Sequence, residues 1–510
     1  MQKADLKSDY LAQAPALRSL YAHSFPCTDY QPLFAQRADF SAHHRDVLVQ
    51  ELRQQNQGLP ENNAVQAAIK RLAEPATYTV TTGHQLCLMG GPMYTIYKIA
   101  TTIRLAAAIQ ARHPEVQVVP IFWMATEDHD WEEINHFWAD FETKITYLGA
   151  FHGPVGRHVL EASIAEIWPE GISEALKAHF KPGKVYAEAF RAFIHDLFGA
   201  HGLVIIDADR PALKGLFEAE MLAEVEGKGM HSHILTQNEK LETSGYKRQI
   251  HPREVNLFYM GDGGRSLIVP NEEGGFTTKD GQHNWSLADL NAEITAHPAD
   301  FSPNVAMRPL YQEKILPNLA YIGGWAEVSY WIQLRQAFQN AEIPFPLLVP
   351  RLSAALVREK EALEIQSLGL TVEDINLPIH QLQDKYLAQD FDEAPLNTAI
   401  SDIFFAYDNL AAQLSEIDPT LATSIQAERA KTESRLKNIP KKVRKALRNQ
   451  NPQPYKQIRD LKSNIQPDNK QQQRTLNLSA FSDIPYRELV NLILDQCEPE
   501  KYSDKWITIS

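Results

Sequence analysis

Hydrophobic and polar positions between residues 78 and 136 follow successive patterns that together predict one βαβ unit. Residues 78–82 and 116–123 are short runs of β-branched and aromatic residues, and residues 93–110 show the spacing of a helix. Two parallel strands need such a crossover connection, so this order predicts an α/β fold built on a parallel sheet. Polar residues that follow each strand then lie at the carboxyl edge of the sheet, where open α/β sheets bind ligands.

Glycine-rich turns join the first of these strands to the helix. Gly83 ends the strand, and Gly90 and Gly91 precede Pro92, which a first helical turn tolerates because its N–H groups have no partner within the helix. Backbone N–H groups and the positive end of a helix suit a phosphate or a carboxylate. A turn needed only for packing is the alternative, since neither the dinucleotide-binding pattern nor the P-loop is present. The predicted anion-binding residues are Thr82, Gly83, Gly90 and Gly91.

Three later apolar runs predict further strands of the same sheet, at residues 201–207, 319–322 and 345–349. Gly323 and Gly324 follow the second run and repeat the strand–glycine–helix junction. We therefore expect Gly323 and Gly324 to contribute to the same ligand site.

The segment near residues 251–300 is predicted to be an insertion in this α/β core. Residues 255–260 and 265–269 read as two strands, and the glycine-rich turn Gly261-Asp-Gly-Gly264 between them predicts a β-hairpin.

From about residue 381 the pattern changes to long helices. Apolar residues there recur in alternating steps of four and three, which predicts a coiled-coil seam, and Asp418-Pro419 separates a second helix that runs to about Asn449. If Pro452 and Pro454 end this second helix, the simplest structure that the two helices can form is an antiparallel helical arm. The seam residues are Leu396, Ile400, Ile403, Tyr407, Leu410, Leu414, Ile417 and Leu421.

These patterns predict three stretches along the 510 residues. They are an α/β core with N-terminal helices over residues 1–380, a helical arm over 381–475, and a C-terminal segment, 476–510, that returns to the core.

Composition narrows the class of protein. The formal net charge is −14, which argues against general nucleic-acid binding, and the basic stretch 429–448 holds nine Lys or Arg and one Glu but no aromatic residue for base stacking. No apolar run approaches the ~20 residues of a membrane span. The first nine residues lack the apolar centre of a signal peptide, and the three cysteines lack metal-type spacing. We expect a cytoplasmic protein without disulfides.

The densest polar cluster, residues 127–136, follows the second strand and contains five acids and two histidines. Carboxylates beside imidazoles can bind a substrate ammonium, act as acid and base, or hold a metal. Capping of a helix by Asp128 or Asp130 is the simpler alternative and needs only one residue. Without H-E-x-x-H or a comparable spacing, no metal ligand is assigned. The predicted catalytic residues here are Asp128, His129 and Asp130.

Four other residues are candidates, each with an ordinary alternative. His84 lies between the glycine turns, where an imidazole could meet a phosphate, although a lone histidine is more often solvated or buried. Glu327 is a first-turn acid favoured by the helix dipole or a substrate contact. Arg308 could bind an anion or form a surface ion pair. Cys87 has no local base, so a nucleophilic role is disfavoured.

The motifs strongly resemble the bacillithiol synthase family, the cysteine ligases assigned to bacillithiol biosynthesis, over essentially the whole chain. They are Thr81-Thr-Gly-His-Gln85, Gly90-Gly-Pro-Met-Tyr-Thr-Ile-Tyr-Lys98, Phe122-Trp-Met-Ala-Thr-Glu-Asp-His-Asp130, Glu133-Ile-Asn-His136, His251-Pro-Arg253, Ser302-Pro-Asn-Val305, Arg308-Pro-Leu-Tyr-Gln312 and Leu319-Ala-Tyr-Ile-Gly-Gly324.

The resemblance implies a Rossmann-like core akin to class I aminoacyl-tRNA synthetases and nucleotidyltransferases, with inserted connecting segments and a coiled-coil arm used for homodimerisation. It also implies a carbon–nitrogen ligase that joins cysteine to glucosaminyl-malate. Activation of a free carboxylate points to ATP and Mg²⁺, yet no K-M-S-K-S-like loop is present to complete a synthetase-type ATP site. We expect Thr82, Gly83, His84, Gly90 and Gly91 to hold phosphate or carboxylate groups. Asp128, His129 and Asp130 are expected to orient an ammonium or assist proton transfer.

Other functions stay open at this point. A different nucleotide- or metal-dependent transferase or hydrolase could use the same acidic turn, and a non-enzymatic scaffold could use the coiled coil alone. A third alternative is a protein that only prepares or delivers cysteine while another forms the amide.

Overall fold

The parallel sheet predicted from the sequence is the centre of the first of two structural units. A computed structural model describes residues 5–149, 151–261 and 264–510. The first unit comprises residues up to 354 together with 473–505, and the second comprises 355–472 and 506–510.

The central sheet has five parallel strands in the order β12-β11-β1-β2-β5. The chain runs outward from β1 through β2 to β5 and then returns to the other side of β1, which is a Rossmann order with its switch point between β1 and β11. This confirms the α/β class. The strands are β1 (Thr77–His84), β2 (Gln117–Met124), β5 (Val204–Asp207), β11 (Asn318–Gly323) and β12 (Leu347–Pro350).

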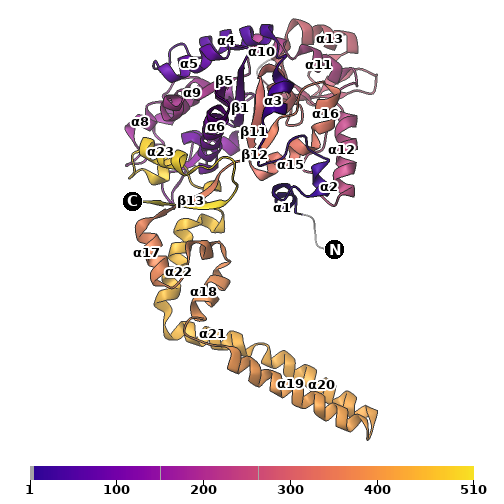
Figure 1. Cartoon of the computed structure of the whole chain (residues 1–510), viewed down its shortest axis with the longest axis vertical. Coiled ribbons are helices and arrows are strands. Elements are labelled where there is room, and N and C mark those ends of the chain that lie inside the picture. Colours follow the sequence, from indigo (N-terminus) through magenta and orange to yellow (C-terminus); the bar gives the residue numbers. More distant parts are fainter. Residues whose placement is uncertain (1–4, 150, 262–263) are drawn as a thin grey trace. The chain divides into compact units, whose positions relative to one another are not determined.

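Helix α6 (Met93–Arg112) packs against β1, β2 and β11, and Figure 1 shows it next to β1 and β11. Most of its side chains are buried, because they face the sheet on one side and other helices on the other. The threonines of β1 satisfy their hydroxyls within the sheet: Thr79 and Thr81 both donate to Asn318 Oδ1 of β11. Buried polar groups paired in this way fix the β1–β11 pairing at little cost.

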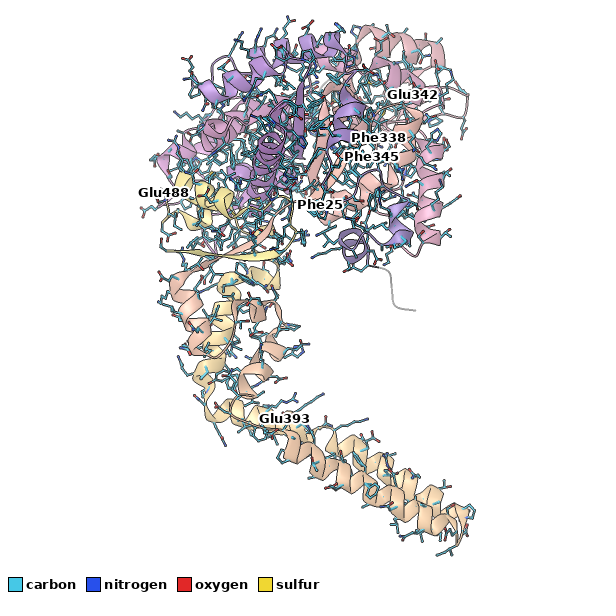
Figure 2. All side chains as sticks on the ribbon, viewed as in Figure 1. Phe25, Phe338, Glu342, Phe345, Glu393 and Glu488 are labelled. Atoms are coloured by element: carbon cyan, nitrogen blue, oxygen red, sulfur yellow. The ribbon has the colours of Figure 1, made fainter. Side chains whose placement is uncertain are left out.

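Further helices of the first unit surround the sheet. On α16, for example, Phe338 lies beside Phe345, which precedes β12, with ring centroids 5.0 Å apart (Figure 2). These helices are α1 (Leu6–Leu11), α2 (Pro15–Arg18), α3 (Gln31–Arg37), α4 (Ala42–Gln55), α5 (Asn63–Arg71), α7 (Trp131–Ile134), α8 (Glu174–Lys177), α9 (Tyr186–Phe198), α10 (Pro211–Gly215), α11 (Glu218–Val225), α12 (His231–Thr243), α13 (Leu287–Ala296), α14 (Arg308–Ile315), α15 (Trp325–Gln333), α16 (Arg335–Asn340) and α23 (Tyr486–Gln496).

The predicted hairpin is part of a second, antiparallel sheet in the order β10-β6-β7-β8-β9. Phe258 pairs with Leu267 and Tyr259 with Ser266 across the β6–β7 pair. The centre of the predicted turn, residues 262 and 263, lies outside the described residues. The strands are β6 (Leu257–Tyr259), β7 (Ser266–Pro270), β8 (Phe276–Thr278), β9 (Asn284–Trp285) and β10 (Phe301–Pro303). Two further two-stranded sheets pair β3 (His136–Trp138) with β4 (Lys144–Thr146), and β13 (Ser353–Arg358) with β14 (Asp504–Ile509).

The second unit begins at residue 355, earlier than the predicted boundary at 381. Val357, Ile365 and Leu382 form one buried cluster with Ile458 and Leu461, so the segment before 381 belongs with the late helices. Pro452 and Pro454 begin α22 rather than end the helical stretch, because proline is accommodated in a first helical turn. The helices are α17 (Glu359–Ser367), α18 (Ile379–Leu387), α19 (Ala394–Ser415), α20 (Pro419–Leu436), α21 (Ile439–Gln450) and α22 (Pro452–Ile465).

Helices α19 and α20 lie side by side as the predicted antiparallel pair (Figure 1). Asp418 caps α20 by accepting from Thr420 N, which explains the break between the helices. Glu393, labelled in Figure 2, precedes α19 and accepts from Arg444 of α21, with 2.6 Å between Arg444 Nη2 and Glu393 Oε2. Several residues of the basic stretch thus pair with acids of neighbouring helices.

The described part of the chain contains no helix that is long and apolar enough to cross a membrane. Cys27, Cys87 and Cys497 are all free thiols.

The turn before α6 provides a test of the fold. Gly90 has φ +80°, and a Cβ there would lie 2.9 Å from the ring of buried Phe193, whereas Gly58 has φ +84° and open space around it. Both Ala variants carry the cost of a left-handed backbone, about 1–2 kcal/mol. In Gly90→Ala the added methyl group also overpacks against Phe193, which should lower the free energy of unfolding by about 1–3 kcal/mol more. We expect urea denaturation to show a clearly larger loss for Gly90→Ala; equal losses would contradict the close approach of Phe193.

Candidate active site

A cavity of about 1110 Å³ lies at the carboxyl ends of the parallel strands, next to the switch point between β1 and β11. Gly83 and His84 at the end of β1 border it together with Gln85. Ala125 and Asp128 follow β2, Gly324 follows β11 and Arg351 follows β12. The inserted sheet contributes Arg265. We call this space the switch-point cavity.

One side of the cavity is built on a buried ion pair between Lys98 and Glu327. Lys98, on α6, donates to Gly83 O at 2.9 Å and lies 2.6 Å from Glu327 Oε2 on α15. Glu327 also accepts from Tyr321 OH at 2.6 Å and from Gly324 N at 2.9 Å. Burial opposes the charge of Glu327, but Lys98 and these donors hold the pKa of its carboxyl below the usual value. The carboxyl of Glu327 is therefore ionised at neutral pH.

Two arginines add positive charge beside this pair. Arg308 lies over the rings of Trp123 and Tyr321, with 5.5 and 5.8 Å from the guanidinium carbon to the ring centroids. Burial and the nearby Arg474 lower the pKa of Arg351 to about 10, so it stays charged near neutral pH. Three cations face one carboxylate here, and we call Lys98, Arg308, Arg351 and Glu327 the basic pole. Its excess of basic side chains suits carboxylates or phosphates.

The opposite charge gathers around Gln85. Its Nε2 donates to Asp128 Oδ2 and to Glu133 Oε2, both at 2.7 Å, and therefore holds two carboxylates together. Asp128 Oδ1 accepts from the backbone N–H of His129 at 2.7 Å. Glu127 borders the cavity as well, but the fully buried Lys214 pairs with it. We call Gln85, Asp128 and Glu133 the acidic pole, which suits a substrate ammonium.

His84 lines the cavity between Gly83, whose carbonyl Lys98 binds, and Gln85, which binds the two carboxylates of the acidic pole. Burial, together with the charge of Lys98, lowers the pKa of its imidazole to about 3, so His84 is neutral at physiological pH. Cys87 Sγ lies 3.9 Å from His84 Nε2. Burial raises the pKa of the Cys87 thiol far above its usual value, which leaves no thiolate for a nucleophilic role.

Several residues predicted for the site do not border the cavity as the structure describes it: Thr82, Gly90, Gly91, Gly323 and Asp130. Thr82 donates within the sheet to Ile322 O, and Asp130 caps α7 by accepting from Glu133 N at 3.3 Å. At the start of α6, the N–H of Met93 already donates to Leu476 O. Gly90 and Gly91 therefore shape a turn beside the site. His84, Gly83, Asp128, His129, Arg308, Gly324 and Glu327 are brought together around the cavity.

Comparison with known proteins divides the chain near residue 353, close to the start of the second structural unit. The family described as "Bacillithiol biosynthesis BshC, N-terminal Rossmann-like domain" matches residues 1–352, and its C-terminal coiled-coil domain matches residues 354–504. The chain belongs to the BshC family. A Cytophaga hutchinsonii protein named "Putative cysteine ligase BshC" is 33% identical over 97% of this chain and 95% of its own length. Proteins with the same name from Flavobacterium johnsoniae (34% identical; 99% and 97% covered) and Bacillus mycoides (30%; 89% and 88%) are also similar.

Membership of the BshC family confirms the resemblance found in the motifs and the Rossmann-like fold with its coiled-coil domain. Lys98, Gln85 and Glu133 lie within the sequence motifs, but the sequence alone assigned them no role in the site. Arg265 and Arg351 were not predicted as site residues. Arg351 follows the last core strand directly, so the rule that ligands bind at strand carboxyl ends could have indicated it. Arg265 offered no comparable signal, because its place depends on how the inserted sheet packs.

The low pKa of His84 predicts a pH dependence of stability. Below pH ~6.5 the unfolded chain takes up a proton at this position, while the folded protein does so only near pH 3, so stability falls as the pH drops. Between pH 7 and pH 5 this loss amounts to about 2 kcal/mol for one such group. Between pH 7 and pH 5 we expect the free energy of unfolding of His84→Gln to fall by about 2 kcal/mol less than that of the parent protein. Denaturation at the two pH values measures this difference. The same pH dependence in both proteins would contradict a neutral, buried His84.

Proposed function

We propose that this protein is a cysteine ligase that joins the carboxyl group of cysteine to the amine of glucosaminyl-malate. The observation that carries the proposal is the separation of charge within one cavity, with the basic pole and the acidic pole on either side of His84. The names of the BshC relatives support the same reaction class.

The two poles match the two kinds of charged group on the substrates. Malate carries carboxylates, and the planar guanidinium groups of Arg308 and Arg351 would bind them through paired N–H donors. The reacting amine arrives as an ammonium, which the carboxylates of Asp128 and Glu133 would hold. Such positioning places the two reactants in one geometry and supplies much of the rate enhancement expected for joining them.

Amide formation also requires an activated carboxyl group and a base. ATP with Mg²⁺ is the simplest source of activation. The activated cysteine carboxyl would then be attacked by the amine, forming the C–N bond and expelling AMP or phosphate. Asp128, oriented by Gln85, would take one proton from the ammonium and so free its lone pair for attack, and the second proton would pass to solvent or to the leaving phosphate group.

Mass spectrometry of the purified protein with glucosaminyl-malate, cysteine and Mg-ATP tests this function. Product with AMP would support an adenylate intermediate, and product with ADP an acyl phosphate. Turnover without ATP or cysteine, lost on EDTA treatment, would indicate a different metal-dependent enzyme. No product with any nucleotide would contradict the proposal that this chain is sufficient.

Asp128 and Asp130 form a matched pair for this assay. Asp128→Asn should lower kcat/KM by roughly 10²-fold or more, because general base catalysis typically contributes 10²–10⁴-fold. Asp130→Asn should stay within about threefold of the parent, since asparagine is an equally good helix cap outside the cavity. Equal activity of the two variants would contradict the role of Asp128.

We further propose that the protein forms a homodimer through the α19–α20 pair. Ile403 and Leu410 lie seven residues apart on α19 and are 41% and 43% exposed, and Ile417 in the turn after α19 is 76% exposed. Leu421 is also 43% exposed. The inner face of the pair is already filled by residues such as Ala411, so this outer stripe remains for the same stripe of a second copy.

The cytoplasmic location predicted from the sequence stays a prediction.

The outer stripe gives a direct test of assembly. Leu410→Asp should convert the dimer to a monomer in light scattering at micromolar concentration, because it places a charge in the apolar contact. Asn409→Asp, one residue away on the exposed surface, should leave the dimer intact. A parent protein that is monomeric, or a Leu410→Asp variant that is dimeric, would contradict this interface.

A further inference from the structure

Arg265 reaches the switch-point cavity from the inserted sheet and is held there by several contacts. Its guanidinium lies 4.0 Å from the ring centroid of Phe258 and donates from Nε and Nη2 to Ser302 Oγ at 3.3 and 3.2 Å. Only 9% of its side chain is exposed. The neighbouring strands β6 and β10 therefore fix both the position and the orientation of the guanidinium.

The remaining nitrogen of Arg265 points at His129. Arg265 Nη1 lies 2.9 Å from His129 Nδ1, and Asp128 Oδ1 lies 3.9 Å from the same Nη1. Asp128 Oδ1 is 3.7 Å from His129 Nδ1, beyond hydrogen-bond distance, and it accepts the backbone N–H of His129 instead. Arg265 is therefore the hydrogen-bond partner of Nδ1.

This contact decides which ring nitrogen of His129 carries the proton. A guanidinium has only donors and keeps its charge in proteins, so Nδ1 has to be the acceptor. A neutral imidazole with an unprotonated Nδ1 carries its hydrogen on Nε2. The alternative tautomer and the imidazolium would both set an N–H against an N–H of Arg265.

We propose that Arg265 is a positioning residue that holds His129 as the Nε2–H tautomer, so that His129 donates a hydrogen bond to an anionic substrate oxygen. The proposal rests on the proposed ligase function, and it gives Asp128 and His129 different tasks. Asp128 receives the proton of the attacking amine, and His129 stabilises the carboxyl oxygen at which negative charge develops. His129 is not the base, because Nε2 already carries its proton and Nδ1 is engaged by Arg265.

The first experiment needs no substrate and does not depend on ligase activity. Nitrogen-15 NMR of the full-length protein with labelled histidine rings, with His129→Gln to identify the signal, reports the tautomer of His129. We expect the Nε2–H form in the parent and in Arg248→Ala, which removes an exposed arginine paired with Glu242. Arg265→Ala should shift the population toward the Nδ1–H form or the imidazolium. An Nδ1–H or charged His129 in the parent, or an unchanged signal in Arg265→Ala, would overturn the proposal.

The second experiment separates a donor from a base once turnover is measured. The side-chain amide of glutamine can donate from nearly the position of Nε2 but cannot accept a proton, so His129→Gln should retain roughly tenfold more kcat/KM than His129→Ala. Equal loss in the two variants would overturn the donor role. Turnover absent from the parent would count against the ligase function, while the tautomer measurement would still decide the role of Arg265.

Discussion

The buried ion pair between Lys98 and Glu327 is the interaction on which the geometry of the site depends. Lys98 binds both Gly83 O at the end of β1 and the carboxylate that caps α15 after β11. It therefore ties together the two strand ends that flank the switch point. A buried charge that loses its partner costs several kcal/mol, so neither member can be removed without disturbing the junction. The cavity is open at this place because the chain leaves β1 and β11 through turns that this pair holds.

Charge is divided across the cavity because different segments provide each sign. Cations come from α6, from the start of α14 and from the residue after β12, while the carboxylates of the acidic pole come from the turn after β2 and from α7. Gln85 keeps two carboxylates at hydrogen-bond distance from one amide, and His84 stays neutral between the poles. An active site that must hold a carboxylate and an amine together needs this separation, since one uniform charge would repel one of the reactants. The charge distribution in the cavity supports the ligase class that the names of the BshC relatives indicate.

Local patterns predicted much of the core, and long-range packing decided what they missed. The strands around residues 78–82 and 116–123, the helix from Met93 and the β6–β7 hairpin were all indicated by periodicity and turn residues. In the sequence Lys98 is indistinguishable from any other helical lysine, because its partner Glu327 is close only in the folded protein. The segment 355–380 was assigned to the core because its late partners, such as Ile458, cannot be seen locally. Asp128 and Asp130 are equivalent in the sequence, and only the direction of the turn separates a cavity residue from a helix cap.

A crystal structure with glucosaminyl-malate bound would show directly where each charged group of the substrate lies. We expect the malate carboxylates within hydrogen-bond distance of Arg308 and Arg351, and the amine against Asp128 and Glu133. A ligand bound in the reverse orientation, or outside the switch-point cavity, would contradict this expectation.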